Sequence, residues 1–299
     1  MKGIIRSFFN RFGYDIVKTE NWHLLRKELK NQVKVGNYEI SMPGDNTLQN
    51  TYHLYPDFNG HLGRLAAVIA KKYPDMTVVD IGANVGDTIA IIKTLVDVPV
   101  IGIEGDDISY QYLEKNAAQF SKVTTIKTFL GDKKHDQKVK FESKGSNTTI
   151  IPSDTGDTTI SFKPLDEVLA DEPYHSANIK LIKLDIEGFD TIVLRGAGEV
   201  IAKNQPVLFF EYNRDVMEHI GEDGLSTLLS FGRFGYNKIA FFDYMGRLLL
   251  VTTMQNTDEI TYLHQYAIGK NNLLGYYDIC LFHQQDDAVA TDFLKGEEN

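Results

Sequence analysis

Residues 78–88 have the sequence Val-Val-Asp-Ile-Gly-Ala-Asn-Val-Gly-Asp-Thr, in which an apolar strand runs into a glycine-rich turn that opens a helix. Glycines at such a turn let the backbone bend tightly and approach a ligand closely. The spacing G-x-N-x-G differs from the G-x-G-x-x-G of dinucleotide sites. Because the carboxylate of Asp80 at the strand end would repel a pyrophosphate, we expect a positively charged ligand at this turn.

The next predicted strand, Val98–Ile103, leads into Glu104, which lies 18 residues after Gly86. An acidic residue about 20 residues beyond a glycine-rich turn is placed to bind ribose hydroxyls. The two features together indicate an adenosine-type ligand with a cationic group. S-adenosylmethionine (SAM), which carries an ammonium and a sulfonium, meets both conditions.

Short apolar runs alternate with helical patterns from about residue 62 to residue 210. The predicted strands in this part are Thr77–Ile81, Val98–Ile103, Val123–Phe129, Ile179–Leu184 and Val207–Phe210. Strands separated by helices predict an α/β fold with a mostly parallel sheet and helices on both faces. Within this part, the polar stretch 131–157 is expected to hold one hairpin, with Val139–Glu142 as one arm.

The last third of the chain has a different pattern. Asn237–Phe242, Arg247–Thr252 and Asp278–Phe282 are strand-like and are joined without a clear long helix. Such strands fit an antiparallel edge added at the C-terminal end of the parallel sheet.

Acidic side chains follow the strand Ile179–Leu184. Asp185, Glu187 and Asp190 come directly after it, and Glu211 follows the next strand. Ligands of open α/β sheets bind at the carboxyl ends of the strands, so we expect these acids to border one crevice. Asp190 begins a helix, where the helix dipole stabilises a negative charge, which gives it a purely structural explanation.

Composition excludes several classes of protein. The chain of 299 residues has a formal net charge of −10, and concentrated basic charge of the kind that nucleic acids attract is missing. The single cysteine, Cys280, excludes an internal disulfide and a Cys-based zinc site. We find no transmembrane stretch and no signal peptide in the sequence, so we expect a cytoplasmic protein.

The N-terminal part differs from the rest. The first 34 residues hold eight basic and three acidic side chains, a net charge of +5, which leaves −15 for the remainder. Ile4, Ile5, Phe8, Phe9 and Phe12 follow helical spacing. We therefore divide the chain into a basic helical extension with a small hairpin, residues 1–50, and one domain, residues 51–299. The predicted helix either packs on its own domain or makes a weak contact with a membrane surface or a protein partner.

Several motifs together resemble the FkbM family of SAM-dependent methyltransferases. Asp80–Gly86 matches the first motif of the family, and Ile101–Asp107 resembles the second strand and its acid, with Gly105 where proline is usual. Leu130-Gly131-Asp132 and Pro164–Glu167 resemble later signatures. Ile182–Asp190 is similar to K-x-D-x-E-G-x-E, with Asp190 in place of glutamate. The resemblance extends over about residues 80–211.

The resemblance implies a Rossmann-like class I methyltransferase domain that uses SAM as methyl donor. By position, the methionine part of SAM would be held by four residues, namely Asp80, Gly82, Asn84 and Gly86. Glu104 would bind the ribose, Asp132 the adenine amino group, and Asp185 would lie near the sulfonium. Members of the family mainly methylate hydroxyl oxygens of polyketides and sugars. The Phe12–Ile16 segment looks like members associated with glycan assembly, so a small-molecule or glycan acceptor is expected.

Methyl transfer to an alcohol needs a base, because an aliphatic hydroxyl barely ionises at neutral pH. The candidates are Asp185, Glu211, Glu187 and His53, with Asp185 or Glu211 preferred. His53 stands among aromatic residues that could stack on a sugar, although an ordinary loop histidine explains it as well. Asp185, Glu187 and Glu211 could alternatively hold a divalent cation, but we predict no metal.

Three functions remain open at this point. The leading hypothesis is a SAM-dependent O-methyltransferase that acts on a sugar, a glycan or a related hydroxylated metabolite. The second is a non-catalytic SAM-binding scaffold of a biosynthetic complex. The third, a dinucleotide-dependent oxidoreductase, is disfavoured by Asp80 and by the missing third glycine.

Overall fold

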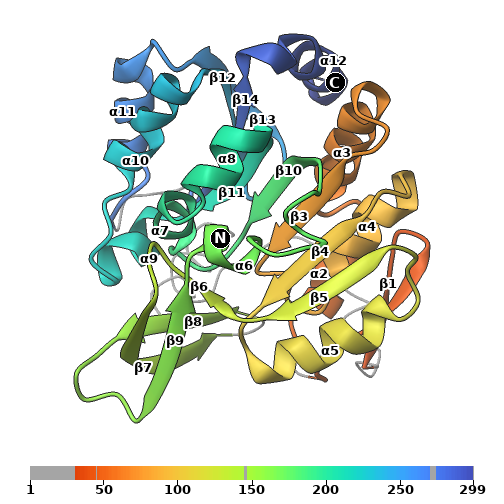
Figure 1. The fold of residues 1–299 in the computed structure, drawn as a ribbon, viewed down its shortest axis with the longest axis vertical. Coiled ribbons are helices and arrows are strands. Elements are labelled where there is room, and N and C mark those ends of the chain that lie inside the picture. Colours follow the sequence, from red (N-terminus) through yellow and green to blue (C-terminus); the bar gives the residue numbers. More distant parts are fainter. Residues whose placement is uncertain (1–30, 45, 145–146, 270–273, 299) are drawn as a thin grey trace, which may run out of the picture.

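The computed structural model describes residues 31–44, 46–144, 147–269 and 274–298 (Figure 1). The amphipathic helix predicted at residues 4–12 lies outside these ranges. Among the described helices, none combines the length and the apolar character that crossing a bilayer requires.

An eight-stranded sheet forms the centre of the molecule, in the order β13-β12-β14-β11-β10-β3-β4-β5 (Figure 1). Its strands are β3 (Thr77–Ile81), β4 (Val100–Glu104), β5 (Val123–Lys127), β10 (Ile179–Leu184), β11 (Val207–Tyr212), β12 (Tyr236–Asp243), β13 (Leu248–Thr253) and β14 (Tyr277–His283). Strands β5, β4, β3, β10 and β11 pair in parallel, whereas β14 and β12 pair antiparallel with their neighbours. The predicted parallel sheet with an antiparallel C-terminal edge is confirmed.

Helices cover both faces of this sheet. One face carries α3 (Gly60–Lys72), α4 (Asp87–Leu95), α5 (Asp107–Ala117) and α12 (Asp287–Glu297). The other carries α6 (Leu165–Val168), α7 (Asp190–Arg195), α8 (Gly198–Asn204), α9 (Arg214–His219), α10 (Leu225–Ser230), η2 (Phe231–Phe234) and α11 (Thr257–Tyr266). Side chains alternate along each strand. Val78 therefore packs against the helices of the first face, and Val79 packs against those of the second. A short 3-10 turn, η3 (Gln284–Asp286), leads from β14 into α12.

A second sheet lies beside the first and extends the predicted hairpin. It has the order β6-β9-β7-β8 and is formed by β6 (Phe129–Leu130), β7 (His135–Lys144), β8 (Asn147–Pro152) and β9 (Thr158–Lys163). Strands β7 and β8 are the expected hairpin, and β9 adds a third strand that buries Ile160 and Phe162. Figure 1 places this sheet below α7 and α9.

Helix α11 corrects the expectation that the last strands follow one another without a long helix. Its ten residues lie between β13 and β14. Asp258 and Glu259 in the first turn interact favourably with the helix dipole, and Ile260 and His264 form the buried side. This short buried stripe explains why the sequence pattern alone did not reveal the helix.

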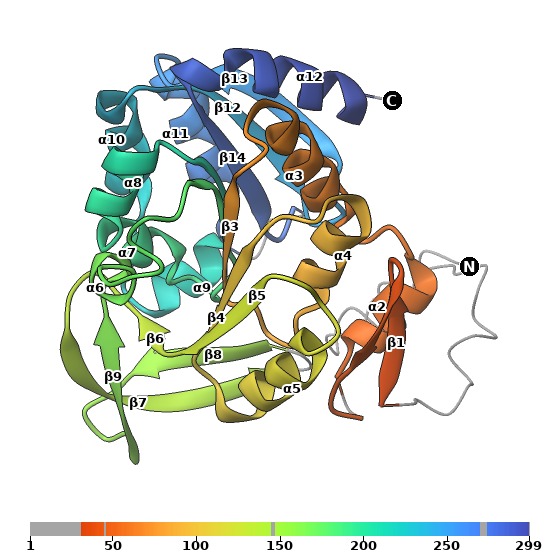
Figure 2. The ribbon, with the colours of Figure 1, turned by 45° about the vertical axis from the view of Figure 1, so that its right-hand side comes forward.

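The small hairpin predicted near residue 36 is confirmed as β1 (Gln32–Val35) and β2 (Tyr38–Ser41). It packs with α2 (Leu48–Leu54) against α4 and α5, as Figure 2 shows. Val33 and Ile40 share a buried cluster with Ala90 and Ile91 of α4. The hairpin therefore packs on the main domain, and the division of the chain at residue 50 stays a prediction.

Candidate active site

The turn after β3 contains two residues in the left-handed backbone conformation. Gly82 has φ 71°, and Asn84, which is not glycine, has φ 47°. A Cβ atom on Gly82 would come within 2.1 Å of the backbone oxygen of Asp185. The turn therefore packs directly against the end of β10, and only glycine fits at this position.

Gly82→Ala is expected to distort this contact, since alanine adds both a collision and a strained φ. We expect a lower melting temperature together with weaker ligand binding in the pocket. Gly198→Ala is the matched control, because a Cβ at Gly198 meets nothing within 4 Å. Thermal unfolding of both variants checks this; equal melting temperatures would contradict the proposed packing.

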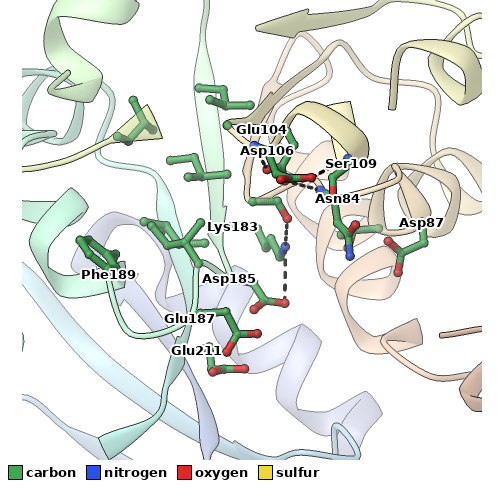
Figure 3. A pocket seen from close by; sticks show the side chains of 18 of the residues that line it. Asn84, Asp87, Glu104, Asp106, Ser109, Lys183, Asp185, Glu187, Phe189 and Glu211 are labelled. Carbon is green, nitrogen blue, oxygen red and sulfur yellow. Dashed lines mark hydrogen bonds and ion pairs between the residues drawn. The ribbon is translucent and has the colours of Figure 1, made fainter. Parts of the chain in front are cut away.

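Glu104 ties the turn to the end of β4. Its Oε2 accepts a hydrogen bond from the backbone N–H of Asn84 at 2.9 Å, and its Oε1 accepts one from Asp106 N–H at 2.8 Å. Asp106 caps α5 by accepting from Ile108 N–H and Ser109 N–H. The carboxylate therefore has a fixed place at the edge of the pocket (Figure 3).

A cavity of about 330 Å³ opens at the carboxyl ends of β3, β4, β10 and β11, where ligands of open α/β sheets bind. The second sheet closes one side of it with Phe129, Ile150 and Phe162. Phe189, at the start of α7, stacks on Phe162 with ring centroids 5.7 Å apart. The predicted residues that line the cavity are Gly82, Asn84, Glu104, Asp185, Glu187 and Glu211.

Lys183 supplies a buried positive charge at the base of the cavity. Its Nζ lies 3.2 Å from Asp80 Oδ1 and donates a hydrogen bond to the Gly82 backbone oxygen at 3.2 Å. Asp185 Oδ2 lies 3.8 Å away (Figure 3). Burial lowers the pKa of Lys183, but Asp80 and Asp185 raise it by more, so the side chain stays protonated.

Three carboxyl groups stand together beyond Lys183 in Figure 3, those of Asp185, Glu187 and Glu211. Asp278 joins them, because it pairs with Glu211 in the register of β11 and β14 and lines the same cavity. Burial, and then the carboxylates of Asp185 and Glu187, raise the pKa of Glu211 well above its usual range. Burial, and then the charge of Asp185, also raise the pKa of Asp278 well above its usual range.

Glu187 combines two unusual properties. Its backbone has φ 51°, a left-handed conformation that is rare outside glycine and costs free energy. Burial, followed by the charge of Asp185, raises the pKa of its carboxyl to about 7. The pKa of this carboxyl therefore lies closer to neutral pH than that of an ordinary glutamate.

Within the described ranges, no three His, Cys, Asp or Glu side chains converge in a way that could hold a metal ion.

Four predicted site residues do not line the cavity: Asp80, Gly86, Asp132 and His53. The carboxylate of Asp80 is fully buried under Lys183, since the two residues are neighbours in the register of β3 and β10. Gly86 is the N-cap residue of α4 and faces Leu113 of α5.

Asp132 and His53 are displaced for separate reasons. The chain at Leu130 pairs with Lys163 of β9, which carries Asp132 away from the cavity toward Gly196. His53 is exposed because its neighbour Tyr52 occupies the buried side of α2. The Tyr52 hydroxyl donates to Asp87 Oδ2 at 2.7 Å. Direct contact of Asp132 or His53 with a ligand in this cavity is therefore not supported.

Sequence reasoning missed Lys183, Asp278, Asp87 and Tyr276 as lining residues. Lys183 carried a usable signal, because a lysine inside the otherwise apolar strand Ile-Lys-Leu-Ile-Lys-Leu needs a buried anion. Asp87 directly follows the glycine turn. Asp278 and Tyr276 carried no signal, since only the antiparallel pairing of β14 brings them to the cavity.

The residues that line the cavity on the side of β4 are chemically suited to bind SAM. A carboxylate at the end of β4, Glu104, suits ribose hydroxyls, and Gly105 next to it leaves room for the Phe129 ring, which a Cβ would meet at 2.3 Å.

A family model described as the methyltransferase FkbM domain matches residues 80–238. The chain belongs to the FkbM methyltransferase family. The match includes the end of β3, the strands β4, β10 and β11 and the second sheet, whereas β14, which brings Asp278 to the cavity, lies beyond it. The resemblance inferred from the motifs is confirmed, and the chain contains a methyltransferase FkbM domain of α/β fold.

Solved structures similar to this FkbM-family chain include other methyltransferases. Methyltransferase FkbM from Methylobacillus flagellatus KT is 21% identical, with 55% of this chain and 39% of that chain covered and a TM-score of 0.38. The METTL16 methyltransferase domain is 13% identical, with 82% and 72% covered and a TM-score of 0.41. A SAM-dependent methyltransferase from Aquifex aeolicus is 12% identical, with 73% and 92% covered and a TM-score of 0.34.

The chain thus spans about two fifths of the length of the Methylobacillus protein. No curated protein matches the sequence.

Proposed function

We propose that this methyltransferase moves a methyl group from SAM to a hydroxyl of a sugar, a glycan or a related hydroxylated metabolite by direct displacement. The observation that carries the proposal is Glu187, an ionisable group at the cavity with a pKa near neutrality. A general base works best when its pKa lies close to the working pH.

Bound SAM supplies a methyl group on a sulfonium, so its transfer to a hydroxyl oxygen forms one C–O bond, breaks one C–S bond and releases one proton. Glu187 accepts that proton from the hydroxyl. Asp185 lies 3.8 Å from the Lys183 ammonium, and burial raises the pKa of Glu211 well above its usual range. These differences favour Glu187 over the two residues preferred from the sequence.

The donor is assigned to the side of the cavity formed by the glycine turn and β4. Glu104 binds the ribose hydroxyls with the lone pairs that the backbone N–H groups of Asn84 and Asp106 leave available. Gly105 and Phe129 border the space for the adenine. Positioning of two reactants in one pocket contributes several kcal/mol to such a displacement, about 7 or more in favourable cases.

The acceptor is assigned to the opposite side of the cavity. Tyr276 offers an aromatic ring there, and its neighbours Glu211 and Asp278 offer carboxyl groups. Sugars present apolar C–H faces and hydroxyl edges, which suit rings and carboxyls respectively. This combination supports a carbohydrate or similarly hydroxylated acceptor.

A two-step experiment tests this function. SAM is first titrated into the protein by calorimetry, and release of S-adenosylhomocysteine is then followed with a panel of glycans. Binding together with release supports the proposal. Binding without release on any acceptor would favour the non-catalytic scaffold, and no binding at all would refute both.

The pH dependence follows from Glu187. The ionised carboxylate is the active form, and its pKa is raised to about 7, so kcat/KM should rise through this pH and then level off. Initial rates measured between pH 5 and 9, about two units on each side, test this. A profile that is flat over this range would argue against Glu187 as the base.

Location and partners stay predictions. We place the reaction in the cytoplasm. The predicted membrane or protein contact of the basic segment falls on residues 1–30, which lie outside the described part of the chain.

A further inference from the structure

Lys183 is the one lysine or arginine among the described residues that line the cavity. It is 4% exposed, and its ammonium lies between the glycine turn and the acid cluster (Figure 3). The role proposed above for Glu187 leaves this cation without a function in the reaction.

The contacts of Lys183 leave part of its ammonium facing the cavity. The ammonium donates a hydrogen bond to the Gly82 oxygen at 3.2 Å and forms an ion pair with Asp80 Oδ1 at 3.2 Å. Asp185 Oδ2 at 3.8 Å is too far for a hydrogen bond, and the Asp185 side chain is 44% exposed. An N–H of Lys183 and the Asp185 carboxylate therefore both remain available to a ligand.

An ammonium and a carboxylate held side by side complement a ligand that has a carboxylate to face the ammonium and an ammonium to face the carboxylate. The amino-acid end of SAM is such a group, because its carboxylate and its ammonium sit on one carbon. The pair also lies beside the glycine turn, since Lys183 binds Gly82 and the oxygen of Asp185 touches the same residue.

We propose that Lys183 and Asp185 together bind the zwitterionic amino-acid end of SAM, with Lys183 contacting its carboxylate and Asp185 its ammonium. This inference rests on the proposed function, since it takes SAM as the donor. In this arrangement Asp80 is a positioning residue, because its buried carboxylate holds the Lys183 ammonium in place below the cavity.

Two ligands isolate the amino-acid end. S-adenosylhomocysteine contains it, and 5′-methylthioadenosine keeps the adenosine and the thioether without it. Their affinities are measured by calorimetry on the full chain and on three variants. Asp185→Asn changes a half-exposed side chain, Asp80→Asn/Lys183→Met removes both partners of the buried ion pair, and Lys180→Met is a matched control on the same strand outside the cavity.

The wild-type protein should bind S-adenosylhomocysteine about 100-fold or more tightly than 5′-methylthioadenosine, as two charge-assisted contacts imply. Asp185→Asn and the double variant should each reduce this ratio about tenfold or more without changing the affinity for 5′-methylthioadenosine. Lys180→Met should leave the ratio unchanged.

Equal affinities of the two ligands for the wild-type protein would overturn the inference while leaving an adenosine site in place. A ratio that stays the same in both variants, or an equal loss of both ligands, would also overturn it. Failure of the wild-type protein to bind SAM and both probes would instead refute the proposed function.

Discussion

Glu187→Gln should lower kcat about 10²- to 10⁴-fold, the range that a general base contributes. Glutamine has nearly the same shape but cannot accept the proton of the acceptor hydroxyl. The affinity for SAM should stay close to that of the wild-type protein, because the residue is assigned to the acceptor side of the reaction. Steady-state release of S-adenosylhomocysteine, with SAM affinity measured separately, distinguishes the two effects.

Glu218→Gln provides the control for this substitution. Glu218 is exposed on α9 and does not line the cavity, so the same chemical change should leave the rate unaltered. The variant Glu187→Gln should also lose the rise of kcat/KM near pH 7, since that rise belongs to the Glu187 carboxyl. A fully active Glu187→Gln enzyme would exclude Glu187 as the base.

Lys183→Met should destabilise the fold by about 3–5 kcal/mol, because it leaves the buried carboxylate of Asp80 without its cation. Removing both charges in Asp80→Asn/Lys183→Met should restore most of the lost stability, since a pair of neutral side chains leaves no isolated charge. Urea unfolding of the wild-type protein and both variants gives the free energies of unfolding.

The comparison of the single and double variants is the decisive one. A single variant as stable as the wild-type protein would show that Asp80 does not depend on Lys183. A double variant no more stable than the single one would show that the damage comes from lost packing of the lysine stem rather than from charge.

Local patterns predicted the part of the fold that holds the glycine turn. The strand Thr77–Ile81, the turn and the helix that begins at Asp87 follow one another in sequence, and each has a clear signature. Strand β9 and helix α11 were missed because they are short and bury few side chains each. Their positions depend on contacts with distant segments, which periodicity does not contain.

In the candidate site, too, the residues set by local sequence were predicted and those set by distant contacts were not. Gly82, Asn84 and Glu104 were found because spacing along the chain determines their positions. The partnership of Asp80 with Lys183 depends on the register of β3 against β10, which only the folded chain reveals. The sequence predicted a positively charged ligand beside Asp80, and the structure places the ammonium of Lys183 there.

The central claim is methyl transfer from SAM to an acceptor oxygen. The most direct measurement uses SAM with an isotopically labelled methyl group, a panel of glycans, and mass spectrometry with NMR to locate the label. We expect the label as a methyl ether on a hydroxyl oxygen, with one S-adenosylhomocysteine released per methyl group. A label on nitrogen or carbon, or SAM binding without transfer to any hydroxylated acceptor, would contradict it.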